Sequence, residues 1–195
     1  VYPLWHLMRE ARRSGVPVLL EGQGADEALA GYPQYAAIDF LQHVRSSWSS
    51  PLQTWSLGRR LRAMTKTFTA RWALLWLLRE TFPSLVAVNR RHIGAGATLR
   101  PEFVARVSSE SMQAGAQAPR GLDAVGKRLW LDHSRNVLPG LLHYGDAVSM
   151  AHGIESRNPF LDYRLVEWMF RLPPRLRFSH GETKWVLREY LRQNG

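Results

Sequence analysis

Apolar residues recur at helical spacing near the start of the chain and then give way to a short apolar run. On residues 2–14 one face of a predicted helix carries Leu4, Leu7, Met8 and Ala11. Gly15 ends this helix, and residues 16–20 have the continuous apolar pattern that is typical of a fully buried parallel strand. Residues 21–27 then predict a loop, followed by a short helical stretch of small residues.

The remainder of the chain has predominantly helical spacing. Residues 33–133 predict helices broken at prolines and glycines and contain no catalytic pattern, and residues 136–152 predict a helix after Pro139. Asp162 can cap a further helix, whose apolar face consists of Leu165, Val166, Met169 and Phe170. The last helix, over residues 182–192, is expected to bury Val186, Leu187, Tyr190 and Leu191. Since only one strand is clear, we expect the rest of any parallel sheet to precede Val1.

The composition is that of a folded protein, with 45% hydrophobic residues, 22% charged residues and eight tryptophans. The absence of cysteine excludes disulfides and cysteine-ligated metals. The longest apolar run, residues 72–78, is far shorter than the roughly 20 residues of a membrane span. We therefore expect a soluble protein with no membrane partner, while the absence of cysteine does not fix its compartment. Because the chain starts with Val1 and not with methionine, we also expect it to be a piece of a longer polypeptide.

The net charge of +10 is concentrated in the middle of the chain, where residues 45–128 hold fourteen basic and four acidic residues. A basic patch of this kind supplies the affinity for phosphates that nucleic-acid-binding proteins need. However, the chain has no zinc-finger, RNP-type or basic-zipper pattern, and the excess is almost entirely arginine, which suits a compositional bias equally well. A nucleic-acid partner is therefore not expected, and the role of the basic middle third stays open.

The loop that follows the predicted strand is the most informative local feature. Ligands bind at the carboxyl ends of parallel strands, and Gly22 and Gly24 allow a ligand to approach the backbone closely. Asp26 and Glu27 place two carboxylates at the end of the loop, where they are suited to Mg²⁺. The alternative interpretation is an ordinary strand–turn–helix connection in which Asp26 caps the helix.

A second block of polar residues covers residues 146–152 and 155–162. Pro159 forces Asn158 into an extended conformation, which predicts a rigid loop between two helices, with Glu155 and Arg157 as a partly buried pair before it. The simpler interpretation is a loop anchored in the core by Phe160 and Leu161 and followed by the Asp162 cap.

A third feature is Lys184, which is predicted in the first turn of the last helix. A cation is unfavourable there by about 0.3–1 kcal/mol unless an anion such as phosphate is bound. The alternative is a solvated surface lysine that pairs weakly with Glu182 or Glu189.

Together the three blocks resemble the synthetase domain of glutamine-dependent asparagine synthetases. That family has a strand followed by Ser-Gly-Glu-Gly-Ala-Asp-Glu and, four residues later, Gly-Tyr; residues 21–27 and 31–32 match these places. Its second block matches residues 146–151 and 155–167, and its terminal Lys-x-x-Leu-Arg matches residues 184–188. Order and spacing agree over residues 16–32 and 136–192, whereas residues 33–133, basic and variable, match no motif.

The resemblance implies an α/β fold of the Rossmann-like ATP pyrophosphatase type, mostly helical here and with few parallel strands. The whole chain, residues 1–195, would be the carboxyl-terminal part of one such domain. In this family ATP adenylates the side-chain carboxylate of aspartate, with Mg²⁺, and ammonia from a separate glutaminase domain converts the acyl-adenylate to asparagine, AMP and pyrophosphate. That glutaminase domain and the pyrophosphate loop are missing from the chain, so the 195 residues alone are expected to be inactive. We also allow for a homodimer.

The resemblance also assigns roles to particular residues. Glu21, Gly22 and Gly24 would line ATP, while Asp26 and Glu27 would hold Mg²⁺. Two residues would act in catalysis, and three would shape the side of the site that takes the substrate. The catalytic pair is Lys184, which would neutralise the departing pyrophosphate, and Gln23. The substrate group is Asp146, Glu155 and Arg157.

Three departures from the family pattern leave other substrates open. Gln23 replaces a glutamate and cannot act as a base, Glu21 replaces a serine, and Ala147 replaces an arginine that contacts anions. Related ligases close β-lactam or macrolactam rings or amidate surface polymers with the same adenylation. A non-catalytic remnant that acts as a binding module is the third possibility.

Overall fold

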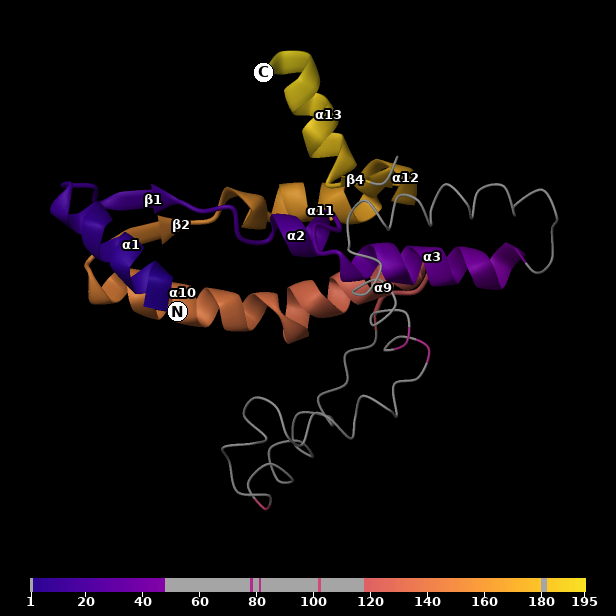
Figure 1. Cartoon of the computed structure of the whole chain (residues 1–195), viewed down its shortest axis with the longest axis horizontal. Helices are drawn as coiled ribbons and strands as arrows, with labels where there is room; N and C mark the ends of the chain where they lie inside the picture. Colours follow the sequence, from indigo (N-terminus) through magenta and orange to yellow (C-terminus); the bar gives the residue numbers. More distant parts are fainter. Residues whose placement is uncertain (1, 48–77, 79–80, 82–101, 103–117, 180–181) are drawn as a thin grey trace.

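The computed structural model describes residues 2–47, 78, 81, 102, 118–179 and 182–195 (Figure 1). The first described part contains α1 (Tyr2–Arg13), β1 (Val18–Leu20), α2 (Ala25–Ala28) and α3 (Gln34–Ser47). The second contains α9 (Ala124–Leu131), the π-helical turn η2 (Asp132–Asn136), α10 (Leu138–Ala151), β2 (Glu155–Arg157), the 3₁₀ turn η3 (Pro159–Leu161), α11 (Tyr163–Arg171), α12 (Pro174–Arg177), β3 (Phe178–Ser179), β4 (Glu182–Thr183) and α13 (Trp185–Asn194). The mostly helical character with few strands is confirmed, while most of the basic middle third lies outside the described residues.

A parallel pair of strands, β1 and β2, joins the two described parts, with Val18 opposite Glu155 and Leu20 opposite Arg157 (Figure 1). Residues 155–157, which the sequence placed just before a loop, thus form a strand that was not predicted. The Glu-Ser-Arg segment has no apolar alternation, so nothing in it predicts a strand, and its conformation comes from pairing with β1.

The prediction of a fully buried β1 strand is also wrong. Leu19 packs into a cluster with Met8, Val148 and Ile154, whereas the side chains of Val18 and Leu20 are 37% and 73% exposed. Successive side chains of a strand point to opposite faces, so only the face that carries Leu19 is covered by α1 and α10 in the described residues.

Helix α1 follows the prediction closely. Met8 is buried, and Leu4 and Ala11 pack against its cluster. Leu7 is 60% exposed, so its assignment to the buried face is wrong. Leu7 lies to one side of the face of α1 that is formed by Leu4, Met8 and Ala11 and packs on α10 and β1.

Helices α10 and α11 are confirmed. The side chain of Asp162 caps α11 by accepting the backbone N–H of Arg164 at 2.9 Å. Met169 is fully buried, and Leu165 and Val166 pack around it with Ala28 of α2 and Leu29, which follows α2. The other end of α11 is closed by the buried Arg177, whose guanidinium donates to the carbonyls of Met169 and Phe170. A cation suits the negative end of a helix, and its donors satisfy carbonyls that lack helical partners.

The last helix begins later than predicted, because residues 182–183 form β4 and pair antiparallel with β3. Val186 and Leu187 pack against the Met169 cluster as expected. Tyr190 and Leu191 are 61% and 57% exposed, so their predicted burial is wrong. Figure 1 shows the reason: α13 leaves the other described elements as it runs to the carboxyl terminus. No helix within the described ranges is long and apolar enough to cross a membrane.

Candidate functional site

The loop after β1 continues the strand pairing before it turns. The backbone N–H of Glu21 donates to the carbonyl of Arg157 at 2.8 Å, and the Glu21 side chain accepts the hydroxyl of Ser156 at 2.8 Å. Gly22 is exposed, with open space where a side chain would lie, and Gln23 is half-buried beside it. The loop is thus fixed to β2 at its start and accessible at Gly22.

Gly24 is needed for two separate reasons. Its φ of +91° lies in the left-handed region, and an added Cβ would lie 2.2 Å from Cδ2 of Leu161. The close approach at Gly24 is therefore made by a protein side chain from η3, which supports the simpler interpretation that Leu161 anchors this part of the structure. The contact of Gly24 with ATP, which the family resemblance implies, stays a prediction.

The structure brings together Asp26 and Lys184, which come from two different sequence blocks. Nζ of Lys184 lies 2.9 Å from Oδ1 of Asp26, and the two side chains are 26% and 34% exposed. Asp26 lies in the first turn of α2, where Gly24 occupies the cap position, so the alternative of Asp26 as a helix cap is wrong. A half-exposed pair of opposite charges keeps access to solvent and to ligands.

Lys184 itself differs from both predictions made for it. It occupies the cap position of α13, one residue before the first turn, with a left-handed φ of 53°. Lys184 forms an ion pair with Asp26, while Glu182 and Glu189 both contact Arg192. Left-handed backbone costs a non-glycine residue roughly 1–2 kcal/mol, so the surrounding fold holds Lys184 in a strained position.

Glu27 points away from this pair. It is 1% exposed, and it accepts the hydroxyl of Tyr32 at 2.7 Å. Burial, together with the neighbouring Glu27 carboxylate, raises the pKa of Tyr32 above its ordinary value. Successive residues of a helix point about 100° apart, so Asp26 and Glu27 face different surroundings. Across the described ranges no group of three His, Cys, Asp or Glu residues is placed to hold a metal ion.

The residues fit Mg²⁺ and a phosphate group in part. Asp26 offers a half-exposed carboxylate and Lys184 a half-exposed ammonium, the groups that bind a divalent cation and a phosphate. Glu27 is committed to Tyr32 and does not fit the second ligand position that the sequence assigned to it.

The three residues assigned to the substrate side are all exposed. Nε of Arg157 donates to Glu155 at 2.8 Å, and the two side chains are 62% and 58% exposed, so the expectation of a partly buried pair is wrong. Both side chains share the open face of the sheet with Val18 and Leu20, because they lie directly opposite these residues. Asp146 lies on the exposed side of α10.

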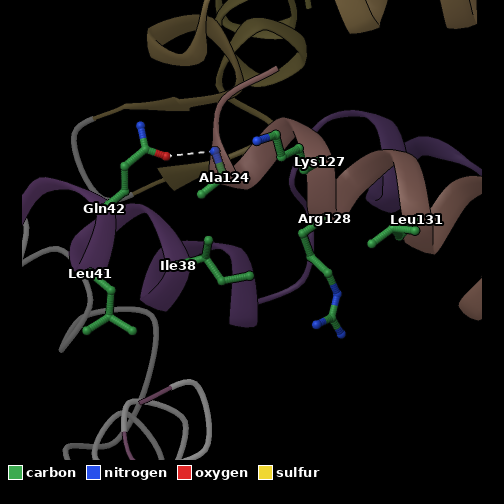
Figure 2. Close-up of a pocket in the computed structure, with 7 residues that line it drawn as sticks. All are labelled: Ile38, Leu41, Gln42, Ala124, Lys127, Arg128 and Leu131. Carbon is green, nitrogen blue, oxygen red and sulfur yellow. Dashed lines mark hydrogen bonds between the residues drawn. The ribbon is translucent and has the colours of Figure 1, made fainter. Parts of the chain in front are cut away.

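A hollow of about 370 Å³ lies between α3 and α9 (Figure 2). Its lining includes Ile38, Leu41 and Leu131, and Gln42 closes one end by accepting the backbone N–H of Ala124 at 2.9 Å. None of its lining residues belongs to the loop after β1 or to α13, so it is separate from the Asp26–Lys184 pair.

Sequence reasoning missed one prominent carboxylate, Asp132. It is fully buried at the start of η2 and accepts hydrogen bonds from four side chains: Gln34, Tyr35, Arg128 and Asn136. The only local signal is the spacing of Arg128 and Asp132, four residues apart on a helix. Its partners on α3 are far away in the sequence, so the pattern alone does not predict the cluster.

Comparison with known proteins identifies the family of the chain. The asparagine synthase family matches residues 1–194, which is almost the entire chain. The chain belongs to the asparagine synthase family. The expected family resemblance, including both blocks that supply the ion pair, is thereby confirmed.

The curated relatives of this family member carry different names. A putative glutamine-hydrolyzing asparagine synthetase of Mycobacterium tuberculosis is 29% identical over 97% of the chain and 29% of its own length. The amidase chyE of Penicillium rubens is 26% identical over 94% of the chain and 30% of its own length. The amidase chry2 of Gibberella zeae is 23% identical over 96% of the chain. The chain thus spans about 30% of the length of these relatives, and no solved structure matches it.

Proposed function

We propose that this chain is part of an ATP-dependent amide ligase that adenylates a carboxylate and passes it to ammonia. The observation that carries the proposal is the 2.9 Å contact between Asp26 and Lys184, beyond the carboxyl end of the parallel strand β1. Ligands bind at this end of parallel sheets, so the pair lies where a nucleotide of a Rossmann-like ATP pyrophosphatase domain would be bound. The β1–β2 pairing supports that fold class.

Each group at the loop has a role in this reaction. ATP would supply the adenylyl group, and Asp26 would hold the Mg²⁺ that accompanies the phosphates. The Lys184 ammonium would stabilise negative charge on the departing pyrophosphate, which is where fixed cations contribute most. Glu21, Gly22 and Gly24 would line the nucleotide, with Gly22 giving the most open approach to the backbone.

The backbone strain at Lys184 is a second argument for function. Lys184 and Ala30 are the non-glycine residues with positive φ in the part of the chain that the structure describes. Strained residues of this kind persist where the surrounding structure needs the side chain in one place. Here the strain directs a lysine toward Asp26, which suits a residue that must meet phosphates.

The substrate we propose is aspartate, with ammonia from glutamine supplied by a glutaminase domain outside this chain, in the cytoplasm. Asp146 and the exposed Glu155–Arg157 pair would meet the substrate. A different carboxylate is the second candidate, because Gln23 and Ala147 depart from the family motif and two similar proteins are named amidases.

The test is ATP–pyrophosphate exchange by the full-length native protein, with and without aspartate. We expect Asp26→Ala and Lys184→Ala each to lower the exchange rate by roughly 100-fold or more. Lys127→Ala, which removes an exposed lysine on α9, is the matched control and should leave the rate unchanged.

The outcomes separate the candidates. Exchange that requires aspartate, together with asparagine as product, supports the first. Exchange that aspartate does not stimulate points to another carboxylate. Full exchange by the Asp26→Ala and Lys184→Ala variants would contradict the proposed site. Exchange by the isolated 195-residue chain would contradict the expectation that these residues alone are inactive.

A further inference from the structure

The turn between α2 and α3 is hydrogen-bonded to the backbone of both Asp26 and Lys184. The N–H of Gly31 donates to the carbonyl of Asp26 at 2.9 Å, and the N–H of Lys184 donates to the carbonyl of Leu29 at 3.1 Å. Ala30, between these two anchors, has a left-handed φ of 57°. The turn therefore passes directly beside both charged residues and fixes how far apart their backbones lie.

Gly31 leaves the space in which the two side chains meet. A Cβ added to Gly31 would lie 1.7 Å from Oδ1 of Asp26 and 2.5 Å from Cε of Lys184. Those distances are far inside van der Waals contact, so the ion pair and a side chain at position 31 cannot occupy the same space. Oδ1 is the atom that pairs with the lysine ammonium, and Cε is the carbon that carries this ammonium.

The backbone does not explain the glycine. Gly31 is not among the glycines with positive φ, which include Gly15, Gly24, Gly121 and Gly153. An L-residue could therefore adopt its conformation without strain. What position 31 requires is empty volume on the side that faces Asp26 and Lys184.

We propose that Gly31 is a positioning residue for the ligase reaction, and that its missing side chain sets the separation of Asp26 and Lys184. This inference rests on the proposed function. Alanine at position 31 pushes against the ends of two flexible, half-exposed side chains, which turn toward solvent at small cost to the fold. The same movement takes the carboxylate away from the position in which it would bind Mg²⁺ and the ammonium away from the position in which it would bind phosphate.

The first test is the Gly31→Ala variant of the full-length protein. We expect its kcat for ATP–pyrophosphate exchange to fall by roughly 100-fold, the effect of an ångström-scale misplacement of a catalytic group. In the Asp26→Ala/Lys184→Ala double variant, where the Cβ has neither side chain to displace, the same substitution should lower the remaining rate no further. Gly140→Ala is the control: position 140 lies on the exposed side of α10 with open space around it, and its rate should be unchanged. A wild-type rate in Gly31→Ala, or a full 100-fold loss on top of the double variant, overturns the proposal.

The second test does not depend on activity. Gly31→Ala should lower the melting temperature of the wild-type protein by a few degrees and leave it unchanged or higher in the Asp26→Ala/Lys184→Ala double variant, where the Cβ has nothing to displace. If Gly31→Ala unfolds the protein, the double variant must restore folding. An equal loss of stability in both backgrounds contradicts the positioning role. Coupling in melting temperature without any ligase activity would instead show that the proposed function is wrong and the packing argument right.

Discussion

Two carboxylates of the described chain, Asp26 and Asp132, each meet a cationic side chain at 2.9 Å in opposite surroundings. Asp132 is fully buried and accepts from a tyrosine hydroxyl, an arginine and two amides. Asp26 is 34% exposed and faces a half-exposed lysine across the space that Gly31 leaves. The ion-pair distance therefore does not distinguish the two carboxylates. They differ in their burial and in the number of hydrogen-bond donors around them.

The difference separates a structural carboxylate from one that can exchange partners. Buried polar groups need all their hydrogen bonds, since an unpaired one costs about 1–3 kcal/mol, so Asp132 is held by donors from α3, α9 and η2. A half-exposed pair contributes little to stability, and water can replace either partner. The Asp26–Lys184 pair can thus open for a ligand at small cost, whereas the Asp132 cluster cannot.

The largest effect we expect comes from Asp132→Ala. Removal of this carboxylate takes away the acceptor of the buried Tyr35 hydroxyl and one acceptor of the Arg128 guanidinium, and should lower the free energy of unfolding by about 3 kcal/mol. Urea unfolding of the full-length protein measures the loss. The exposed Glu10→Ala change on α1 is the control and should cost less than about 0.5 kcal/mol. A similar small loss for Asp132→Ala would show that burial does not set the two carboxylates apart.

This contrast also shows what the sequence could and could not predict. Helices α1, α10 and α11 follow from apolar spacing, because each buries one face against a neighbouring element. The family motifs assigned Asp26 and Lys184 to one site but did not predict their contact, and no periodicity links residues from opposite ends of the chain. The Asp132 cluster was missed for the same reason: Tyr35 and Asp132 carry no shared motif.

Other misses have local physical causes. Strand β2 is polar, and its conformation depends on the strand beside it. Lys184 adopts a left-handed backbone that residue preference assigns to glycine. Tyr190 and Leu191 have the spacing of a buried face, yet α13 extends beyond the elements it could cover. In each case the tertiary surroundings decide what the local pattern leaves open.

A smaller loss of stability is expected when the half-exposed Asp26–Lys184 pair is removed. Lys184→Ala removes a half-exposed ion pair and should lower the free energy of unfolding by no more than about 1 kcal/mol, while the exchange activity falls sharply. Lys184→Gly loses the same charge but fits the left-handed backbone, so it should be more stable than Lys184→Ala by about 1 kcal/mol. Urea unfolding of both variants tests this order. If Lys184→Ala costs as much as Asp132→Ala, the pair is structural and the site assignment loses its physical basis.

The smallest effect concerns Asp162, a carboxylate on the surface at the start of α11. A side-chain hydrogen bond from Arg164 and the backbone N–H of the same residue lower the pKa of Asp162 from 3.8 to about 2. A lowered pKa in the folded state means that the ionised carboxylate stabilises the fold above its unfolded pKa, and that this contribution is lost as the pH falls toward about 2. Asp162→Asn should therefore be slightly less stable than the wild type at neutral pH.

That difference supplies the measurement. Melting temperatures of the wild type and of Asp162→Asn should differ by a constant amount above about pH 4 and converge as the pH falls toward about 2. The Gly140→Ala variant, which changes no titratable group and leaves the Asp162–Arg164 pair intact, should keep a constant offset from the wild type across the range in which Asp162 titrates. A difference that persists undiminished at low pH would mean that the asparagine loses packing and not charge. The comparison of Asp132, Asp26 and Asp162, in which greater exposure lowers the stability that an ion pair contributes, would then not extend to Asp162.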